Sequence, residues 1–250
     1  MIIREQHGPV TVARLQHGKA SALDVELCDA IHTTFTELRD ADAVVLTGTE
    51  SIFSAGVDLL RLLEEGEAYT REFLPALHRA FTALFCFPRP VVAATNGHAI
   101  AGGCVLVAAC DYRVMASGKG RIGVPELLVG VPFPLLALEA MRFAVPAQHL
   151  QEIVYTGRSY LPEEAQARGL VDEVVDADAV LERSVALATK FAGIPKESFE
   201  LAKSQLRRPT MDFVGKHEAN HDRTVEEVWC REETRQTIQA YMDAIASKRR

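Results

Sequence analysis

Cysteine is scarce in this sequence, and the few cysteines follow no pairing pattern. They are Cys28, Cys86, Cys104, Cys110 and Cys230, an odd number with no C-x-x-C spacing among them. A scattered, odd set argues against a disulfide framework and favours free thiols in a reducing compartment. We therefore expect a cytoplasmic protein.

Long apolar runs, a leader segment and an excess of basic residues are also missing. The apolar stretch 99–109 is interrupted by glycines and ends at Asp111, well short of the roughly 20 residues that span a membrane. Met1 leads into Ile-Ile-Arg-Glu-Gln, which resembles neither a signal peptide nor a transit peptide. The formal net charge of −7 offers no basic footprint for nucleic acid or an anionic membrane. We expect neither as a partner.

Apolar residues make up 48% of the 250 residues, enough for a sizeable core. The segments 44–47 and 91–95 have the continuous apolar character of buried strands, and 111–116 is strand-like as well. Apolar residues recur at helical spacing before the first of these segments, after the candidate N-cap Asp24, and again from Tyr69 onward, between the first and the second. Strands that alternate with helices predict an α/β fold with largely parallel pairing.

The character of the chain changes near Pro195. Beyond it the sequence is rich in Glu, Arg and Lys at helical spacing and shows no credible strand. This change predicts a core domain over 1–192 and a helical domain over 193–250.

Two glycine-bearing turns carry most of the functional information. They are Phe53-Ser54-Ala55-Gly56-Val57-Asp58-Leu59 and Asn96-Gly97-His98-Ala99-Ile100-Ala101-Gly102-Gly103-Cys104. Each follows an apolar strand and ends in small residues where a helix can begin, so backbone N–H groups there can approach a ligand oxygen closely. Two such turns can direct two N–H donors at one carbonyl oxygen, which is an oxyanion hole. Alternatively, the glycines only permit a helix to pack closely on a strand.

At these two turns the chain resembles the crotonase (enoyl-CoA hydratase/isomerase) superfamily, and the resemblance extends from Ala20 to about Val175. It implies a spiral of repeated β-β-α units followed by helices that cover the active site and form trimer contacts. It also implies an acyl-CoA thioester substrate of fatty acid metabolism, no cofactor beyond the CoA of that substrate, and a homotrimer or dimer of trimers.

The resemblance assigns roles to particular residues. The oxyanion donors are the N–H groups of Val57 and Gly102, and the catalytic carboxylate is Glu126 in the segment Pro125-Glu126-Leu127-Leu128-Val129-Gly130. The residues expected to contact the substrate are Lys19, Ala20, Ala22, Val57, Asp58, Leu59, Leu60, Gly102, Gly103 and Phe133.

The chain departs from the hydratases of that superfamily at one decisive position. They hold a water molecule between two glutamates, and Val105 stands here in place of the first. One carboxylate is sufficient to move a proton from C2 to C4 of a 3-enoyl-CoA. The bulky segment 131–138 beside Glu126 also favours a dry acyl pocket, so we expect an isomerase, with a hydratase or another CoA-ester lyase or hydrolase as the alternative. Glu139 is expected to be a solvated helix residue rather than a second carboxylate of the site.

A competing motif lies in the C-terminal region. His217-Glu218-Ala219-Asn220-His221 matches H-E-x-x-H, the pattern of a zinc metallopeptidase, with Glu232 or Glu233 as a possible third ligand. Charged neighbours flank the motif, whereas a zinc-binding helix is apolar around its ligands. We therefore expect a solvated amphipathic helix and no metal site.

Overall fold

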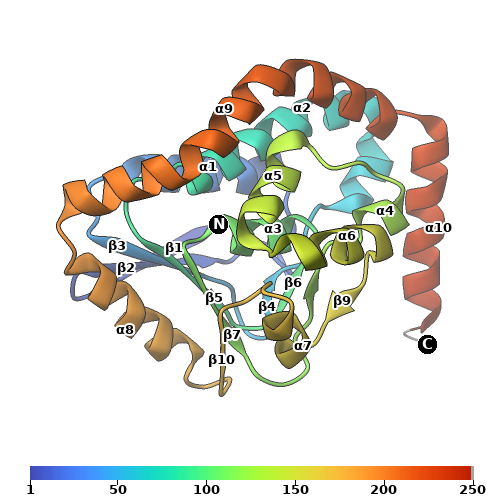
Figure 1. The fold of residues 1–250 in the computed structure, drawn as a ribbon. Helices are drawn as coiled ribbons and strands as arrows, with labels where there is room; N and C mark the ends of the chain where they lie inside the picture. Colours follow the sequence, from blue (N-terminus) through green and yellow to red (C-terminus); the bar gives the residue numbers. More distant parts are fainter. Residues whose placement is uncertain (249–250) are drawn as a thin grey trace.

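Strands and helices alternate along the chain, as the apolar periodicity predicts (Figure 1). The computed structural model describes residues 1–248. The strands are β1 (Ile2–His7), β2 (Val10–Leu15), β3 (Ala43–Thr47), β4 (Ile52–Ser54), β5 (Val91–Thr95), β6 (His98–Ile100), β7 (Tyr112–Ala116), β8 (Ile122–Gly123), β9 (Ser159–Tyr160) and β10 (Glu173–Val175). The helices are α1 (Val25–Glu37), α2 (Leu59–Phe85), α3 (Gly102–Ala109), α4 (Glu126–Val129), α5 (Leu135–Ala144), α6 (Ala147–Thr156), α7 (Pro162–Ala167), α8 (Val180–Ala192), α9 (Lys196–Trp229) and α10 (Glu232–Lys248).

Three consecutive β-β-α units organise the core: β3-β4-α2, β5-β6-α3 and β7-β8-α4. The first strand of each unit joins a six-stranded sheet of order β1-β2-β3-β5-β7-β10, and the second joins a four-stranded sheet of order β4-β6-β8-β9. The central strands pair in parallel, with Val44 beside Val91 and Val92 beside Tyr112. The expected spiral of repeated β-β-α units is therefore confirmed.

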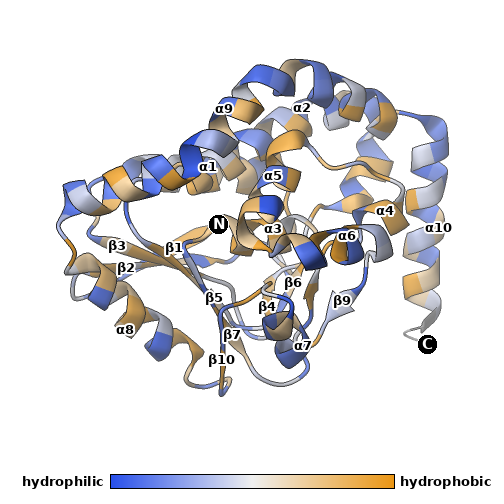
Figure 2. Cartoon of the chain, in the orientation of Figure 1, coloured by the Kyte–Doolittle hydropathy of each residue, from blue (hydrophilic) through white to orange (hydrophobic). Residues whose placement is uncertain are grey.

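The central strands β3 and β5 of the six-stranded sheet are buried on both faces, which explains why they lack a polar alternation (Figure 2). One face packs on α8, where Val45 and Val92 meet Leu187 in a small core. The other face belongs to a larger core that includes α1, α2, α3 and α5. Every residue of α3 is buried, so this helix is held on all sides.

The helix α2 begins earlier than its apolar pattern predicts. We expected it from Tyr69, but it begins at Leu59, where the Asp58 carboxylate accepts a hydrogen bond from the N–H of Arg61 (3.1 Å). Gly66, with φ of 70° and ψ of −147°, bends the helix between these two parts. The apolar positions of the first part do not continue the spacing of the second, because the bend at Gly66 turns a different side of the helix toward the core.

The long helix α9 crosses the top of the molecule in Figure 1, and α10 descends along one side of it. The expected helices beyond Pro195 are confirmed, while the boundary at residue 192 stays a prediction. Within residues 1–248, no helix is both long enough and apolar enough to cross a membrane.

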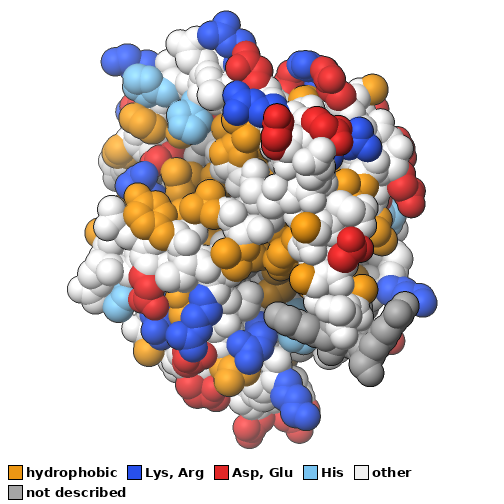
Figure 3. Space-filling model, turned by 90° about the vertical axis from the view of Figure 1, so that its right-hand side faces the viewer, with side chains coloured by type: hydrophobic (Ala, Val, Ile, Leu, Met, Phe, Trp, Pro, Cys, Tyr) orange, Lys and Arg blue, Asp and Glu red, His pale blue; other side chains and the backbone are white. Residues whose placement is uncertain are grey.

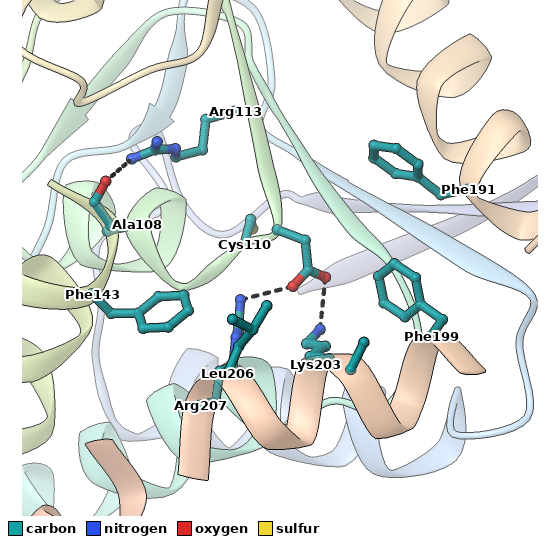
Figure 4. Close-up of a pocket in the computed structure, with 12 residues that line it drawn as sticks. Ala108, Cys110, Arg113, Phe143, Phe191, Phe199, Lys203, Leu206 and Arg207 are labelled. Carbon is teal, nitrogen blue, oxygen red and sulfur yellow. Dashed lines mark hydrogen bonds and ion pairs between the residues drawn. The ribbon is translucent and has the colours of Figure 1, made fainter. Parts of the chain in front are cut away.

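Two buried cations fasten α9 to the core beside a cavity of about 330 Å³ (Figure 4). Lys203 Nζ lies 2.6 Å from Asp111 Oδ2 and donates to the carbonyl of Arg89 (3.0 Å). Arg207 donates to Asp111 Oδ1 (2.8 Å) and to the carbonyls of Phe85 and Ala109, the last residues of α2 and α3. Cations at carboxyl ends of helices satisfy unpaired carbonyls there, so this network fixes where α9 runs.

Candidate active site

The two glycine turns lie against each other at the edge of the four-stranded sheet. The first turn begins within β4 and the second contains β6. These two strands pair in parallel, and the turns lead into α2 and α3. Gly56 has φ of +83°, and a Cβ there would lie 2.5 Å from the carbonyl oxygen of Ile100. A Cβ on Gly103 would lie 2.6 Å from the carbonyl oxygen of Ser54. The glycines therefore do permit close packing, and this packing is what brings the two turns together.

Each turn presents one backbone N–H without a partner. The segment around Val57 pairs with Leu23 through its neighbours: Leu23 N–H donates to Gly56 (2.7 Å) and Asp58 N–H donates to Leu23 (2.9 Å). In such a parallel bridge the N–H of Val57 itself faces away from Leu23. Gly102 is the first residue of α3, where helical N–H groups have no internal acceptor. Neither N–H donates to any residue that the structure describes.

The second turn adopts a costly backbone conformation next to Gly102. Ala101 has φ of +53° and ψ of −126°, and few residues other than glycine adopt a positive φ. Its N–H is held by the carbonyl of Gly123 (2.8 Å) in the neighbouring strand β8. Backbone strain of this kind persists where surrounding contacts over-determine it, and it concentrates at functional sites.

A cavity of about 500 Å³ opens in front of the two turns. Its lining is mostly apolar and comes from both glycine turns, the 20–22 segment, α4, the loop after α4, and both C-terminal helices. The lining residues are Ala20, Ala22, Ala55, Val57, Asp58, Leu59, Leu60, Ile100, Ala101, Pro125, Glu126, Val129, Val131, Ser159, Trp229, Tyr241, Met242 and Ile245. Figure 3 views the molecule from the side of α10 and shows apolar side chains gathered across the middle of this face.

Glu126 is the carboxylate of this cavity that is free to react. It is the first residue of α4, is only 8% exposed, and its buried Oε2 has no hydrogen-bond partner among the described residues. Burial raises the pKa of Glu126 to about 8 because the charged form loses its hydration. Such a carboxyl group can take up and release a proton near neutral pH, as a general base or acid must.

Asp58 is the other carboxylate in the lining, and its oxygen is engaged as the N-cap of α2. Val105 lies buried within α3 and does not line the cavity. Because this position is a valine, the chain has no carboxylate where the resemblance places the first glutamate of the hydratases.

The expectation for Glu139 was wrong. It is 7% exposed rather than solvated, and it pairs with Arg142 Nε at 3.0 Å within α5. The reason is that α5 packs against both α3 and α9, which buries more of its surface than the sequence pattern suggests. Glu139 does not line the cavity.

The structure brings together most of the predicted substrate-contacting residues. Ala20, Ala22, Val57, Asp58, Leu59 and Leu60 all line the cavity together with Glu126. Four others do not line it. Lys19 is exposed beside Ala20, Gly102 and Gly103 are buried in the first turn of α3, and Phe133 is buried in the main core.

The resemblance implied that C-terminal helices cover the site, but sequence reasoning named none of the residues with which they line the cavity. Trp229 ends α9, and Tyr241, Met242 and Ile245 line the cavity from α10. The available signal was the helical spacing of Ile238, Tyr241, Met242 and Ile245 on α10. Nothing in the local sequence indicated which cavity this apolar face would cover. Tyr241 lies close enough to Glu126 to be affected by its charge: burial and the charge of Glu126 raise the pKa of Tyr241.

The H-E-x-x-H segment does not take part in this cavity. His217 and His221 are exposed on α9, as expected for a solvated helix, and Glu218 lies 3.4 Å from His78 Nε2 of α2. Among residues 1–248, no group of three or more His, Cys, Asp or Glu side chains is arranged to hold a metal ion.

Comparison with known proteins gives a consistent result. The family model described as enoyl-CoA hydratase/isomerase matches residues 5–248. The mitochondrial enoyl-CoA delta isomerase 1 of Mus musculus is 28% identical, over 99% of this chain and 88% of its own length. A putative enoyl-CoA hydratase of Thermus thermophilus is 37% identical, over 66% of this chain and 65% of its own length.

A solved structure shares the fold over nearly the whole chain. The crystal structure of human mitochondrial delta3-delta2-enoyl-CoA isomerase superimposes with a TM-score of 0.93, covering 99% of this chain and 98% of that one. The two sequences are 22% identical, so this likeness speaks for the fold alone.

Proposed function

The chain belongs to the enoyl-CoA hydratase/isomerase family, and from that premise we propose that it is a Δ3,Δ2-enoyl-CoA isomerase. One observation carries the proposal. Among residues 1–248, the cavity lining holds one carboxylate free for proton transfer, Glu126, and the hydratase position for a second is filled by buried Val105. A proton shuttle needs one such group, whereas adding water in the hydratase manner needs two.

The reaction begins with the thioester carbonyl of a 3-enoyl-CoA between the two unpaired N–H groups of Val57 and Gly102. Glu126 removes a proton from C2, and the electron pair of that C–H bond moves into a dienolate whose negative charge lies on the thioester oxygen. Two fixed N–H donors stabilise that charge, and one such donor contributes roughly 3–4 kcal/mol. The protonated Glu126 then returns the proton to C4, which leaves the double bond between C2 and C3.

The environment of Glu126 suits both halves of this shuttle. A pKa of about 8 keeps the carboxylate basic enough to take the proton and the carboxylic acid acidic enough to return it. The apolar lining excludes water, which protects the dienolate and disfavours hydration.

An enoyl-CoA hydratase remains the second candidate, because the Thermus thermophilus relative is named a putative hydratase. Such an activity requires a second group that orients water. Asp58 lines the cavity, but its carboxylate caps α2. This arrangement favours the isomerase.

We further propose that Lys19, exposed beside the lining residue Ala20, contacts the anionic CoA end of the substrate. We also propose a homotrimer or a dimer of trimers. Large apolar side chains exposed along α9, Leu201, Leu206 and Phe213, support self-association. A cytoplasmic location stays a prediction from the unpaired cysteines.

The decisive experiment incubates the protein separately with 3-enoyl-CoA and 2-enoyl-CoA and follows conjugation and hydration independently. We expect rapid conversion of 3-enoyl-CoA to the conjugated 2-enoyl-CoA and little formation of 3-hydroxyacyl-CoA. Hydration that matches or exceeds isomerisation would overturn the assignment in favour of the hydratase.

A further inference from the structure

The helix that carries Glu126 is too short to hold its own position. α4 has four residues, Glu126–Val129, and ends at Gly130 in the left-handed conformation. Only a few backbone hydrogen bonds close it, among them Val131 N–H to the carbonyl of Glu126 (3.0 Å). Isolated helices of this length are unstable, so the place of the Glu126 carboxylate depends on what grips the chain just after it.

The following segment, Val131-Pro132-Phe133-Pro134, contains two prolines and so lacks two backbone donors. It is held instead by side chains of α9. The indole Nε1–H of Trp229 donates to the carbonyl of Pro132 at 2.9 Å. Asp222 Oδ1, two turns earlier on α9, accepts from the N–H of Leu135 at 2.8 Å and so caps α5.

α10 adds a third contact to the same region. Gly130 packs against Thr237, where a Cβ on the glycine would lie 2.8 Å from Thr237 Cγ2. Trp229 itself is firmly placed. It is 4% exposed, its ring centroid lies 6.4 Å from that of Phe73, and its helix is fastened to the core by Lys203 and Arg207.

We infer that Trp229, supported by Asp222, is a positioning residue for Glu126. The Trp229–Pro132 hydrogen bond fixes the loop after α4 and thereby the placement of the carboxylate opposite the Val57 and Gly102 N–H groups. Trp229 also lines the cavity, so the same side chain keeps water away from Glu126. This inference rests on the proposed isomerase function.

Trp229→Phe tests the hydrogen bond with little change to the wall, because phenylalanine keeps an aromatic ring but lacks the N–H. We expect kcat for 3-enoyl-CoA to fall about tenfold while KM changes less than twofold, since small misplacements of a catalytic group are costly. A loosened, better hydrated Glu126 also has a lower kinetic pKa, so the pH profile of kcat should shift toward acid. Tyr155→Phe, which alters an exposed aromatic residue of α6, is the matched control and should change neither quantity.

Asp222 provides a second, graded test. Asp222→Asn keeps an oxygen that can accept from Leu135 N–H and should retain most of kcat, whereas Asp222→Ala removes it and should lower kcat several-fold. Circular dichroism and the melting temperature identify any variant that fails to fold.

Three outcomes would overturn the inference. One is Trp229→Phe with unchanged kcat and pH profile, which leaves Trp229 a purely structural residue. The second is a rise in KM alone, which makes it only a wall of the pocket. The third is equal loss of kcat in Asp222→Asn and Asp222→Ala. Failure of the proposed function is recognised separately, because then the unaltered protein hydrates 2-enoyl-CoA at least as fast as it isomerises 3-enoyl-CoA, whatever Trp229→Phe does.

Discussion

The two sides of the cavity are built in different ways. One side is backbone: the turns at Gly56 and Ala101 are held by strand pairing and by a glycine so close to the neighbouring turn that no side chain fits in its place. The other side is built from side chains. Glu126 lies on a four-residue helix that is held in place by contacts from α9 and α10. The backbone side is held by contacts between neighbouring strands and turns, such as Gly56 against Ile100. The other side depends on side-chain contacts from the C-terminal helices, such as Trp229 to Pro132, 97 residues apart. We therefore expect a substitution in the backbone side to lower both stability and kcat, and removal of the Glu126 carboxylate to lower kcat while the protein still folds.

Removing the base from the side-chain wall should have the largest effect. Glu126→Gln keeps the shape of the side chain but cannot accept the C2 proton, so we expect kcat to fall roughly 10²–10⁴-fold with a much smaller change in KM. Because burying a neutral amide is easier than burying a charge, the variant should fold normally. Steady-state kinetics with 3-enoyl-CoA and a binding measurement with a saturated acyl-CoA separate the two effects. Full activity in this variant would remove Glu126 from the mechanism and leave Asp58 as the other carboxylate of the lining.

Damage to the backbone wall should reduce both activity and stability. Gly56→Ala places a methyl group 2.5 Å from the Ile100 carbonyl oxygen at a φ of +83°, so the two turns must separate. We expect about 2–4 kcal/mol lower stability and a loss of roughly 10²–10³ in kcat, comparable to losing one oxyanion donor.

The matched control is Gly215→Ala on α9, where a Cβ meets nothing within 4 Å. Alanine in an open helical position should stabilise the protein by up to about 1 kcal/mol and leave kcat unchanged. Chemical denaturation measures both changes. Equal effects of the two substitutions would show that Gly56 has no special place at the site.

Part of the fold and of the site could be predicted from the sequence alone. The alternation of strands and helices and the two glycine turns follow from local patterns, namely apolar runs and glycines before helix starts. The β-β-α spiral and the role of Glu126 came from the resemblance to the crotonase superfamily. The burial of Glu139 and the early start of α2 follow from neither, because they depend on how α5 meets α9 and where Gly66 bends the chain. Trp229, Tyr241 and Ile245 were missed for the same reason. Their helices reach the cavity only through the path that Lys203 and Arg207 impose on α9.

Changing pH should affect catalysis and stability in opposite directions through one group. The folded protein raises the pKa of Glu126 to about 8, while an unfolded glutamate titrates near 4.3. Between these values the folded state holds a proton that the unfolded state has released, so stability falls as pH rises through this window. Over the same range the basic form of Glu126 accumulates, so kcat rises until about pH 8.

Glu126→Gln is the control for this prediction, because glutamine does not titrate. The denaturation midpoint of the variant should depend less on pH between 5 and 8 than that of the unaltered protein. If both proteins show the same slope, Glu126 is not the group that gives up its proton in this window.

The smallest effect should come from the far end of the side-chain wall. Ile245 lines the cavity from α10, and Ile245→Ala shortens it without touching Glu126 or the glycine turns. Each additional methylene buried on binding contributes about 0.8 kcal/mol, or roughly fourfold in affinity. The enlarged cavity should therefore favour 3-enoyl-CoA substrates with longer acyl chains by a few-fold in kcat/KM, and short chains should lose a similar factor through weaker contact. Ser247→Ala, at an exposed position on the same helix, should leave the chain-length profile unchanged. A profile that is identical in Ile245→Ala and Ser247→Ala would mean that the acyl chain does not reach α10, and that the C-terminal helices act on the reaction only by holding Glu126.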